Sequence, residues 1–183
     1  MRAITKEEYK EIIDTMESGF LNHRPNHKIA TALKIVANLG LRIGDTLNLK
    51  LSDIVYEGGR YHLDIIEQKT QKKRVFTVPL EIVEYIRQYT RENGIKENEF
   101  IFGTITERQV QRHLKLVCDY LDIENVSTHS FRKMFATEIY KNNDYNVVLV
   151  QQLLQHSSPS ITQRYIGIST QEIENALANH ICL

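Results

Sequence analysis

One stretch of alternating residues constrains the fold of this 183-residue chain more than any other feature. Residues 53–56 and 61–67 alternate apolar and polar side chains on either side of Gly58 and Gly59. This pattern predicts two antiparallel strands joined by a tight turn, because glycine adopts the positive φ angles that such turns need. Residues 74–78 predict a third strand, so the sequence indicates one small antiparallel sheet.

The rest of the chain has the apolar periodicity of helices. A capping box at residues 5–8 begins a helix that ends near Ser18, and Gly40 ends a second helix over residues 27–39 in the left-handed conformation. Further helices are expected at 41–49, 80–93, 106–121, 130–141, 146–154, 160–165 and 170–179. We therefore predict an α+β fold, mainly α, in which a three-stranded antiparallel sheet lies at one edge of a helical domain.

Composition excludes several classes of protein. The 23 basic and 23 acidic residues cancel, so the chain is not basic overall, although a local basic patch remains compatible with this balance. Cys118 and Cys182 cannot build a disulfide framework, and no Cys/His cluster has the spacing of a structural zinc site, so no metal is expected. Without an apolar signal core or a membrane-length apolar run, we expect a cytoplasmic protein that does not contact membranes.

His129 and Arg132 are the most distinctive pair of polar residues. They are three residues apart at the expected start of a helix, so both can address one anion. Taken alone, the pair is more typical of a capping histidine beside a solvated arginine.

Arg42 stands between apolar residues that should be buried. A guanidinium held near a core needs an anion, and either Asp45 or a bound phosphate could supply it. A simple surface pair between Arg42 and Asp45 is the alternative.

A basic turn joins the second and third predicted strands. Its four cations are Lys69, Lys72, Lys73 and Arg74. Such turns are usually only solvated, but this one gathers enough charge to meet a polyanion.

Two further residues complete the set of candidates. His156 follows the apolar run 150–154, and Tyr165 comes nine residues later. Each alone is more typical of a helix cap or of the edge of a core. Together, however, two arginines, two histidines, a lysine and a tyrosine suit transfer of a phosphodiester to a phenol without a metal.

In chain order these candidates resemble the catalytic residues of the tyrosine recombinases, the phage integrase family. The six matching positions are Arg42, Lys69, His129, Arg132, His156 and Tyr165. The resemblance covers residues 39–167 and implies a site-specific recombinase, or integrase, that cleaves and rejoins DNA through a 3′-phosphotyrosyl intermediate without metal or ATP. Four residues depart from those usual in the family, and none of them removes a catalytic group: Gly44, Asp45, Lys133 and Gln155.

The chemistry of the groups, together with this resemblance, suggests a role for each. Arg42 and Arg132 match phosphate oxygens with two hydrogen bonds each. We expect Tyr165 to be the nucleophile, His129 its proton acceptor and His156 a donor to a non-bridging oxygen. Lys69 is the expected proton donor to the leaving oxygen, with Lys72 and Lys73 as rivals. Together with Arg74, these two lysines are otherwise expected to contact DNA phosphates.

The resemblance also predicts partners. We expect residues 1–183 to be a single catalytic domain without a separate N-terminal DNA-clamping domain, so an accessory DNA-binding protein would strengthen the grip on double-stranded DNA. The helix at 170–179 either caps the core or docks on a neighbour in a tetramer. The alternatives are relaxation of DNA in the manner of a type IB topoisomerase and a non-catalytic regulator that occupies recombination sites.

Overall fold

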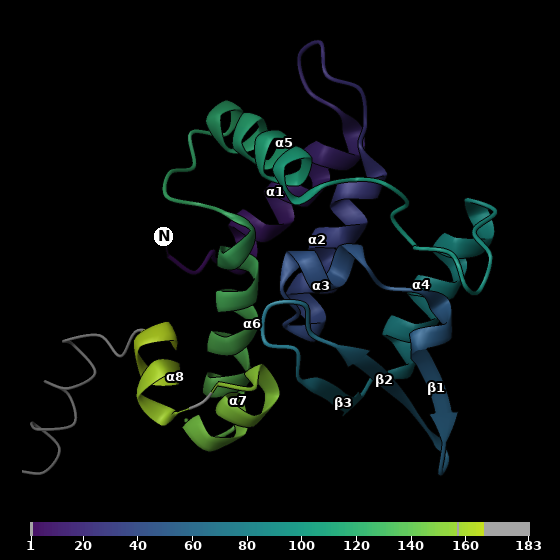
Figure 1. Cartoon of the computed structure of the whole chain (residues 1–183). Helices are drawn as coiled ribbons and strands as arrows, with labels where there is room; N and C mark the ends of the chain where they lie inside the picture. The colour runs from purple at the N-terminus through teal and green to yellow at the C-terminus, as the bar shows by residue number, and fades with distance from the viewer. Residues whose placement is uncertain (1, 157, 167–183) are drawn as a thin grey trace, which may run out of the picture. The chain divides into compact units, whose positions relative to one another are not determined.

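The structure, a computed structural model, describes residues 2–156 and 158–166 (Figure 1). The chain divides into two compact units, residues 1–135 and 136–183, and the division falls inside one helix. The predicted α+β fold is confirmed, with helices predominating and one three-stranded antiparallel sheet. The helix predicted for residues 170–179 lies outside the described residues.

The helices and strands follow the predicted order. The first unit contains α1 (Lys6–Ser18), α2 (His27–Leu39), α3 (Ile43–Leu47), the 3-10 turn η1 (Leu51–Asp53), β1 (Ile54–Glu57), β2 (Arg60–Ile66), β3 (Lys73–Thr77), α4 (Leu80–Glu92), α5 (Glu107–Tyr120) and the beginning of α6 (Thr128–Asn142). The second unit contains the rest of α6, α7 (Val147–Leu154) and α8 (Pro159–Ile166). Among the described residues, no helix has the length and apolarity needed to cross a membrane.

Helix α3 is shorter than the predicted segment 41–49. The Asn48 side chain donates a hydrogen bond to the Gly44 carbonyl oxygen, 2.7 Å away, and the Leu49 amide donates to the Thr46 carbonyl. These bonds satisfy carbonyls that a continuing helix would use, so α3 ends at Leu47.

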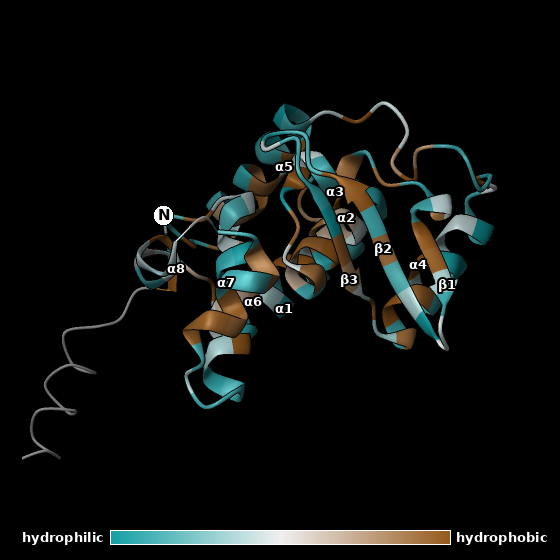
Figure 2. Cartoon of the chain, turned by 60° about the horizontal axis from the view of Figure 1, so that its bottom comes forward, coloured by the Kyte–Doolittle hydropathy of each residue, from teal (hydrophilic) through white to brown (hydrophobic). Residues whose placement is uncertain are grey.

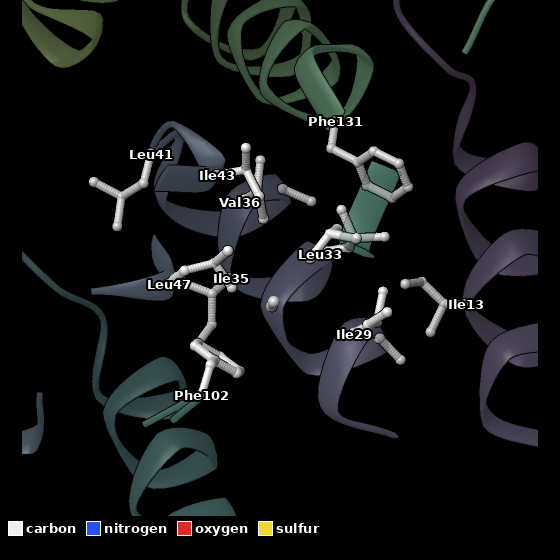
Figure 3. Close-up of a cluster of buried hydrophobic side chains, with 14 of the residues drawn as sticks. Ile13, Ile29, Leu33, Ile35, Val36, Leu41, Ile43, Leu47, Phe102 and Phe131 are labelled. Atoms are coloured by element: carbon white, nitrogen blue, oxygen red, sulfur yellow. The ribbon is translucent and has the colours of Figure 1, made fainter. Parts of the chain in front are cut away.

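Helix α2 forms the centre of the first unit. Its Ile29, Leu33 and Val36 side chains are almost completely buried, and Phe131 of α6 and Ile13 of α1 lie beside them (Figure 3). Burial of such large apolar side chains supplies most of the stabilisation of a fold of this size. The core therefore fixes the end of α2 against the beginning of α6.

The sheet has the strand order β1-β2-β3 (Figure 2). Toward the end of the central strand, buried residues alternate with exposed ones. Leu63 and Ile65 point into the core, whereas Asp64 and Ile66 are exposed. The register pairs Ile65 with Arg74 across β2 and β3. The inward-facing sides of β2 and β3 thus both continue toward the turn that joins these two strands.

Candidate active site

Arg42 lies at the junction between α2 and α3. Its neighbours Leu41 and Ile43 are buried, and only 19% of the Arg42 side chain is exposed. Its Nη1 atom lies 2.5 Å from Oε2 of Glu67 and 3.9 Å from Oδ2 of Asp45. Glu67, and not Asp45, is therefore the nearest anion to this guanidinium.

Glu67 is a fully buried carboxylate directly after β2. Besides Arg42 it contacts Nη1 of Arg74 at 3.3 Å and accepts a hydrogen bond from the Thr70 hydroxyl at 2.9 Å. Burial alone would raise the pKa of Glu67, but the hydrogen bonds from Thr70 and Arg42 and the two nearby cations hold this pKa below its ordinary value. The side chain therefore stays ionised between two arginines.

Arg74 and Arg132 converge on the last carbonyls of α2. Arg132 donates from Nη1 to the Gly40 oxygen at 2.5 Å, and Arg74 donates from Nη2 to the Leu39 oxygen at 3.2 Å. The carbonyl end of a helix carries partial negative charge, which favours cations there. Burial and then the charge of Arg132 lower the pKa of Arg74 to about 10, so Arg74 is still a cation at neutral pH.

His129 is the second residue of α6 and lies three residues before Arg132. Partial burial lowers the pKa of His129, and the charges of Arg132, Arg42 and Lys69 lower it further, whereas Glu107 opposes them. Arg132 reaches the carbonyl oxygen of Gly40, two residues before Arg42, and the Gln68 amide beside Lys69 donates to Asp45, so the four predicted residues of the first unit lie in one region. The imidazole is neutral at neutral pH and can accept a proton.

Glu107, the first residue of α5, fills the space beside Gly44. A Cβ atom at Gly44 would lie 2.5 Å from Oε1 of Glu107 and 3.3 Å from Oε1 of Gln68. Gly44, which departs from the residue usual in the resembled family, therefore makes room for a carboxylate near His129.

The second unit brings His156 and Tyr165 together. Nδ1 of His156 lies 3.0 Å from the Thr162 hydroxyl oxygen, and the rings of His156 and Tyr165 meet edge to face with 5.2 Å between their centroids. Thr162 and Tyr165 are three residues apart on α8, so they share one face of that helix. The six predicted residues thus form two sets, one in each unit.

Comparison with known proteins decides the family. The sequence matches the profile of the phage integrase family over residues 2–172, which is most of the chain. The chain belongs to the phage integrase family. Within this family it is 36% identical over 137 residues to the probable integrase/recombinase YoeC of Bacillus subtilis, covering 72% of each sequence.

Relatives of greater length extend the match. The chain is 28% identical over 181 residues to the tyrosine recombinase XerH of Campylobacter jejuni, which covers 94% of this chain and 50% of that protein. A crystal structure of a XerH recombinase bound to a palindromic difH substrate matches the fold with a TM-score of 0.72 and 20% identity, over 97% of this chain and 52% of that one. The chain therefore spans about half the length of these two relatives. The predicted membership of the tyrosine recombinases is confirmed, and the topoisomerase alternative is not favoured.

The four cations predicted at the turn between β2 and β3 do not all face solvent. Lys69, Lys72 and Lys73 are exposed, and Lys73 pairs with Asp64 at 2.9 Å. Arg74 differs from the prediction, because it is only 2% exposed and points inward to Glu67 and α2. Its position on the buried face of β3, opposite Ile65, is the physical reason.

Sequence reasoning missed Glu67 and Glu107. The alternation of β2 carries a signal for Glu67, since Leu63, Ile65 and Glu67 share the inward-facing parity. A carboxylate on that face needs a buried cation, and Arg74 has the matching parity on β3. Glu107 carries no comparable signal, because only the folded chain brings α5 beside Gly44.

Gln155 occupies a position suited to glycine. It ends α7 with φ 52° and ψ 40°, which is the left-handed conformation. Relatives in the resembled family usually have Gly before the second histidine, and the backbone explains this preference. The chain keeps the conformation without the glycine.

Proposed function

We propose that this chain is the DNA-cleaving domain of a site-specific tyrosine recombinase. Tyr165 attacks the scissile phosphodiester, so that a 3′-phosphotyrosyl bond forms while the bond from phosphorus to the 5′ oxygen breaks. Attack by the 5′-hydroxyl of another strand reverses the step and rejoins the DNA. The observation that supports this proposal most directly is the gathering of Arg42, Arg132 and a neutral His129 in one region.

The charges of that region suit a single phosphodiester. Arg42 and Arg74 both pair with Glu67, and Arg132 reaches the same end of α2 as Arg74, so guanidinium groups are concentrated in this region. A phosphodiester carries one negative charge. Guanidinium groups that are already fixed by the protein stabilise the charge that shifts onto the non-bridging oxygens with little reorganisation.

Proton transfers complete the proposed step. His129 takes the proton of the Tyr165 hydroxyl, which is otherwise too weak an acid to attack at neutral pH. His156, oriented by its contact with Thr162, donates to a non-bridging oxygen. Lys69 on the exposed hairpin gives a proton to the leaving 5′ oxygen.

We propose double-stranded DNA as the partner and a tetramer on paired sites, acting in the cytoplasm, as the working assembly. The related XerH structure contains a palindromic substrate after cleavage, and a palindrome offers the same site to two copies. Lys72 and Lys73 contact phosphates away from the cleavage point. Because the chain spans half the length of XerH, an accessory DNA-binding protein or segment would supply the remaining grip.

A covalent-capture experiment tests the proposal. The protein is incubated in EDTA with a pool of randomised duplexes nicked close to the cleavage position, so that the short fragment carrying the new 5′-hydroxyl diffuses away and the adduct is trapped. The wild type should give protein–DNA adducts whose sequenced DNA shares one site, and Tyr165→Phe should give none. Tyr145→Phe, an exposed tyrosine of the second unit, is the matched control. A metal requirement, or an adduct that survives Tyr165→Phe, would overturn the proposal.

A further inference from the structure

Glu67 is the buried charge for which the proposed mechanism has no use. Its carboxylate is completely excluded from solvent and contacts Arg42, Arg74 and Thr70. A buried carboxylate is costly unless cations and hydrogen bonds compensate it, and this one has three partners. The carboxylate can therefore stay buried only while Arg42, Arg74 and Thr70 keep their contacts with it.

The first consequence concerns Arg42. Its Nη1 atom is 2.5 Å from Glu67, so one edge of the guanidinium is held by the protein. An arginine side chain has several rotatable bonds, and fixing it in advance reduces the entropy lost when it binds a phosphate. Glu67 therefore aims Arg42 as well as neutralising part of its charge.

The second consequence concerns the turn that carries Lys69. The Gln68 amide donates to Oδ1 of Asp45 at 2.8 Å, and the Thr70 hydroxyl donates to Glu67 at 2.9 Å. Lys69 lies between these two tethered residues. The exposed lysine thus stands on a short backbone segment that is attached on both sides to the region around Arg42.

We propose that Glu67 is a positioning residue that holds Arg42 and the Lys69 turn in one arrangement, with the Thr70 hydroxyl as its link to the turn. The inference rests on the proposed function, because it assigns Arg42 and Lys69 to the same phosphodiester. Glu67 touches neither DNA nor the reacting atoms. It acts through the arginine that binds the phosphate and through the lysine that protonates the leaving group.

Two substrates separate these two effects. One has the natural oxygen at the 5′ bridging position of the scissile phosphate, and the other has sulfur there. A thiol is far more acidic than a sugar hydroxyl, so the sulfur leaves without a proton from Lys69. Single-turnover adduct formation is measured on both substrates at saturating protein.

Thr70→Val keeps the shape of the side chain but removes the hydrogen bond to Glu67, together with the long hydrogen bond of 3.4 Å that the hydroxyl accepts from the Lys72 amide within the same turn. We expect its rate on the oxygen substrate to fall about tenfold, and its rate on the sulfur substrate to equal that of the wild type. Thr70→Ser, which keeps the hydroxyl, should restore the rate on the oxygen substrate. Glu67→Gln should lower the rate about a hundredfold on the oxygen substrate. On the sulfur substrate its rate should still be about tenfold below that of the wild type, because Arg42 is also released.

Matched controls come from the same sheet. Glu57→Gln removes an exposed carboxylate from β1, and Thr77→Val removes an exposed hydroxyl from β3. Neither residue contacts Arg42 or Thr70 in any described bond, so both variants should cleave like the wild type. Thermal unfolding establishes that each variant is folded. If Glu67→Gln does not fold, the Thr70 pair decides.

The outcomes distinguish the inference from the function on which it rests. If the wild type forms no adduct, both are overturned. If the wild type forms an adduct while folded Thr70→Val is unaffected, or is slowed equally on oxygen and sulfur, the function stands and the role of Glu67 is rejected.

Discussion

Arg132 donates a hydrogen bond over 2.5 Å to the carbonyl oxygen of Gly40, although 92 residues separate the two in sequence. A second contact lies one turn further along α6, where the ring of Phe135 packs against the backbone of the same glycine. The end of α2 and the beginning of α6 are therefore fixed to each other at two points. This double contact places one of the two proposed phosphate-binding arginines.

Gly40→Ala should destabilise the protein and misplace Arg132. Gly40 has φ 59°, and a Cβ atom there would lie 2.4 Å from Cδ1 of Phe135. Left-handed strain and the forced movement of the ring together should lower the free energy of unfolding by about 3 kcal/mol or more, as measured by urea denaturation.

Gly94→Ala is the control for this prediction. Gly94 also has a left-handed backbone, with φ 64°, but a Cβ atom there would meet nothing within 4 Å. Its cost should be about 1 kcal/mol, from backbone strain alone. Equal losses at the two glycines would mean that contact with Phe135 contributes nothing.

Cleavage should remain active below the pH at which an ordinary histidine is protonated. The pKa of His129 is lowered, so the neutral imidazole persists as the pH falls through 6.5 and is lost only below that value. At DNA concentrations far below saturation, the cleavage rate reports the protonation of the free protein. The fall of this rate toward acid pH should therefore have its midpoint below pH 6.5. A midpoint at or above 6.5 would contradict the role of His129 as proton acceptor in this environment.

Glu107→Gln should move that acid limb further down. The Glu107 carboxylate opposes the cations by raising the pKa of His129, so removing its charge lets the cations act without opposition. Glu97→Gln, an exposed glutamate before α5, should leave the midpoint unchanged. The measurement is the same pH profile, and an upward movement would show that Glu107 acts on His129 in another way.

The hairpin lysines should separate into two kinds. Lys72→Ala and Lys73→Ala should each reduce the slope of log affinity against log salt by about 0.9 while leaving the cleavage rate at saturation nearly unchanged. Lys69→Ala should instead lower that rate by about a hundredfold with little effect on affinity. Filter binding over a range of salt concentrations and single-turnover cleavage give the two quantities. If the lysines exchanged these behaviours, the assignment of Lys69 would be wrong.

Gln155→Gly should stabilise the protein slightly. The substitution relieves left-handed strain at φ 52°, and the greater freedom of glycine in the unfolded chain offsets part of the gain, which leaves about 0.5 kcal/mol. Gln152→Gly, inside the same helix α7, should lower the free energy of unfolding by about 1 kcal/mol. Two changes of the same sign would show that the conformation of Gln155 is not strained.

Local patterns were sufficient to predict most of the fold. The Gly58-Gly59 turn, the capping box at Thr5 and the left-handed Gly40 each depend on a few neighbouring residues, and each is present as predicted. The sequence also indicated that Arg42 needs an anion. It did not identify Glu67 as that anion, because Glu67 and Arg42 meet only when the sheet packs against the end of α2.

Arg74 is the second residue whose surroundings local sequence patterns did not predict. In sequence it continues a run of cations, but its parity on β3 turns it inward, whereas Lys72 and Lys73 remain exposed. A count of charges cannot distinguish these positions. Strand parity separates Arg74 from Lys73 once the partner strand is known, whereas Lys72 is exposed because it precedes β3.

The inward turn of Arg74 also divides the hairpin into regions with different freedom to evolve. Replacing this buried cation would leave Glu67 without one of its two guanidinium partners. Substitutions at position 74 should therefore lower the free energy of unfolding. Lys72 and Lys73 carry no such burden and can be exchanged for other side chains. Exchanges at these two positions would therefore alter the strength and salt dependence of the proposed DNA binding while the anchored end of the hairpin stays the same.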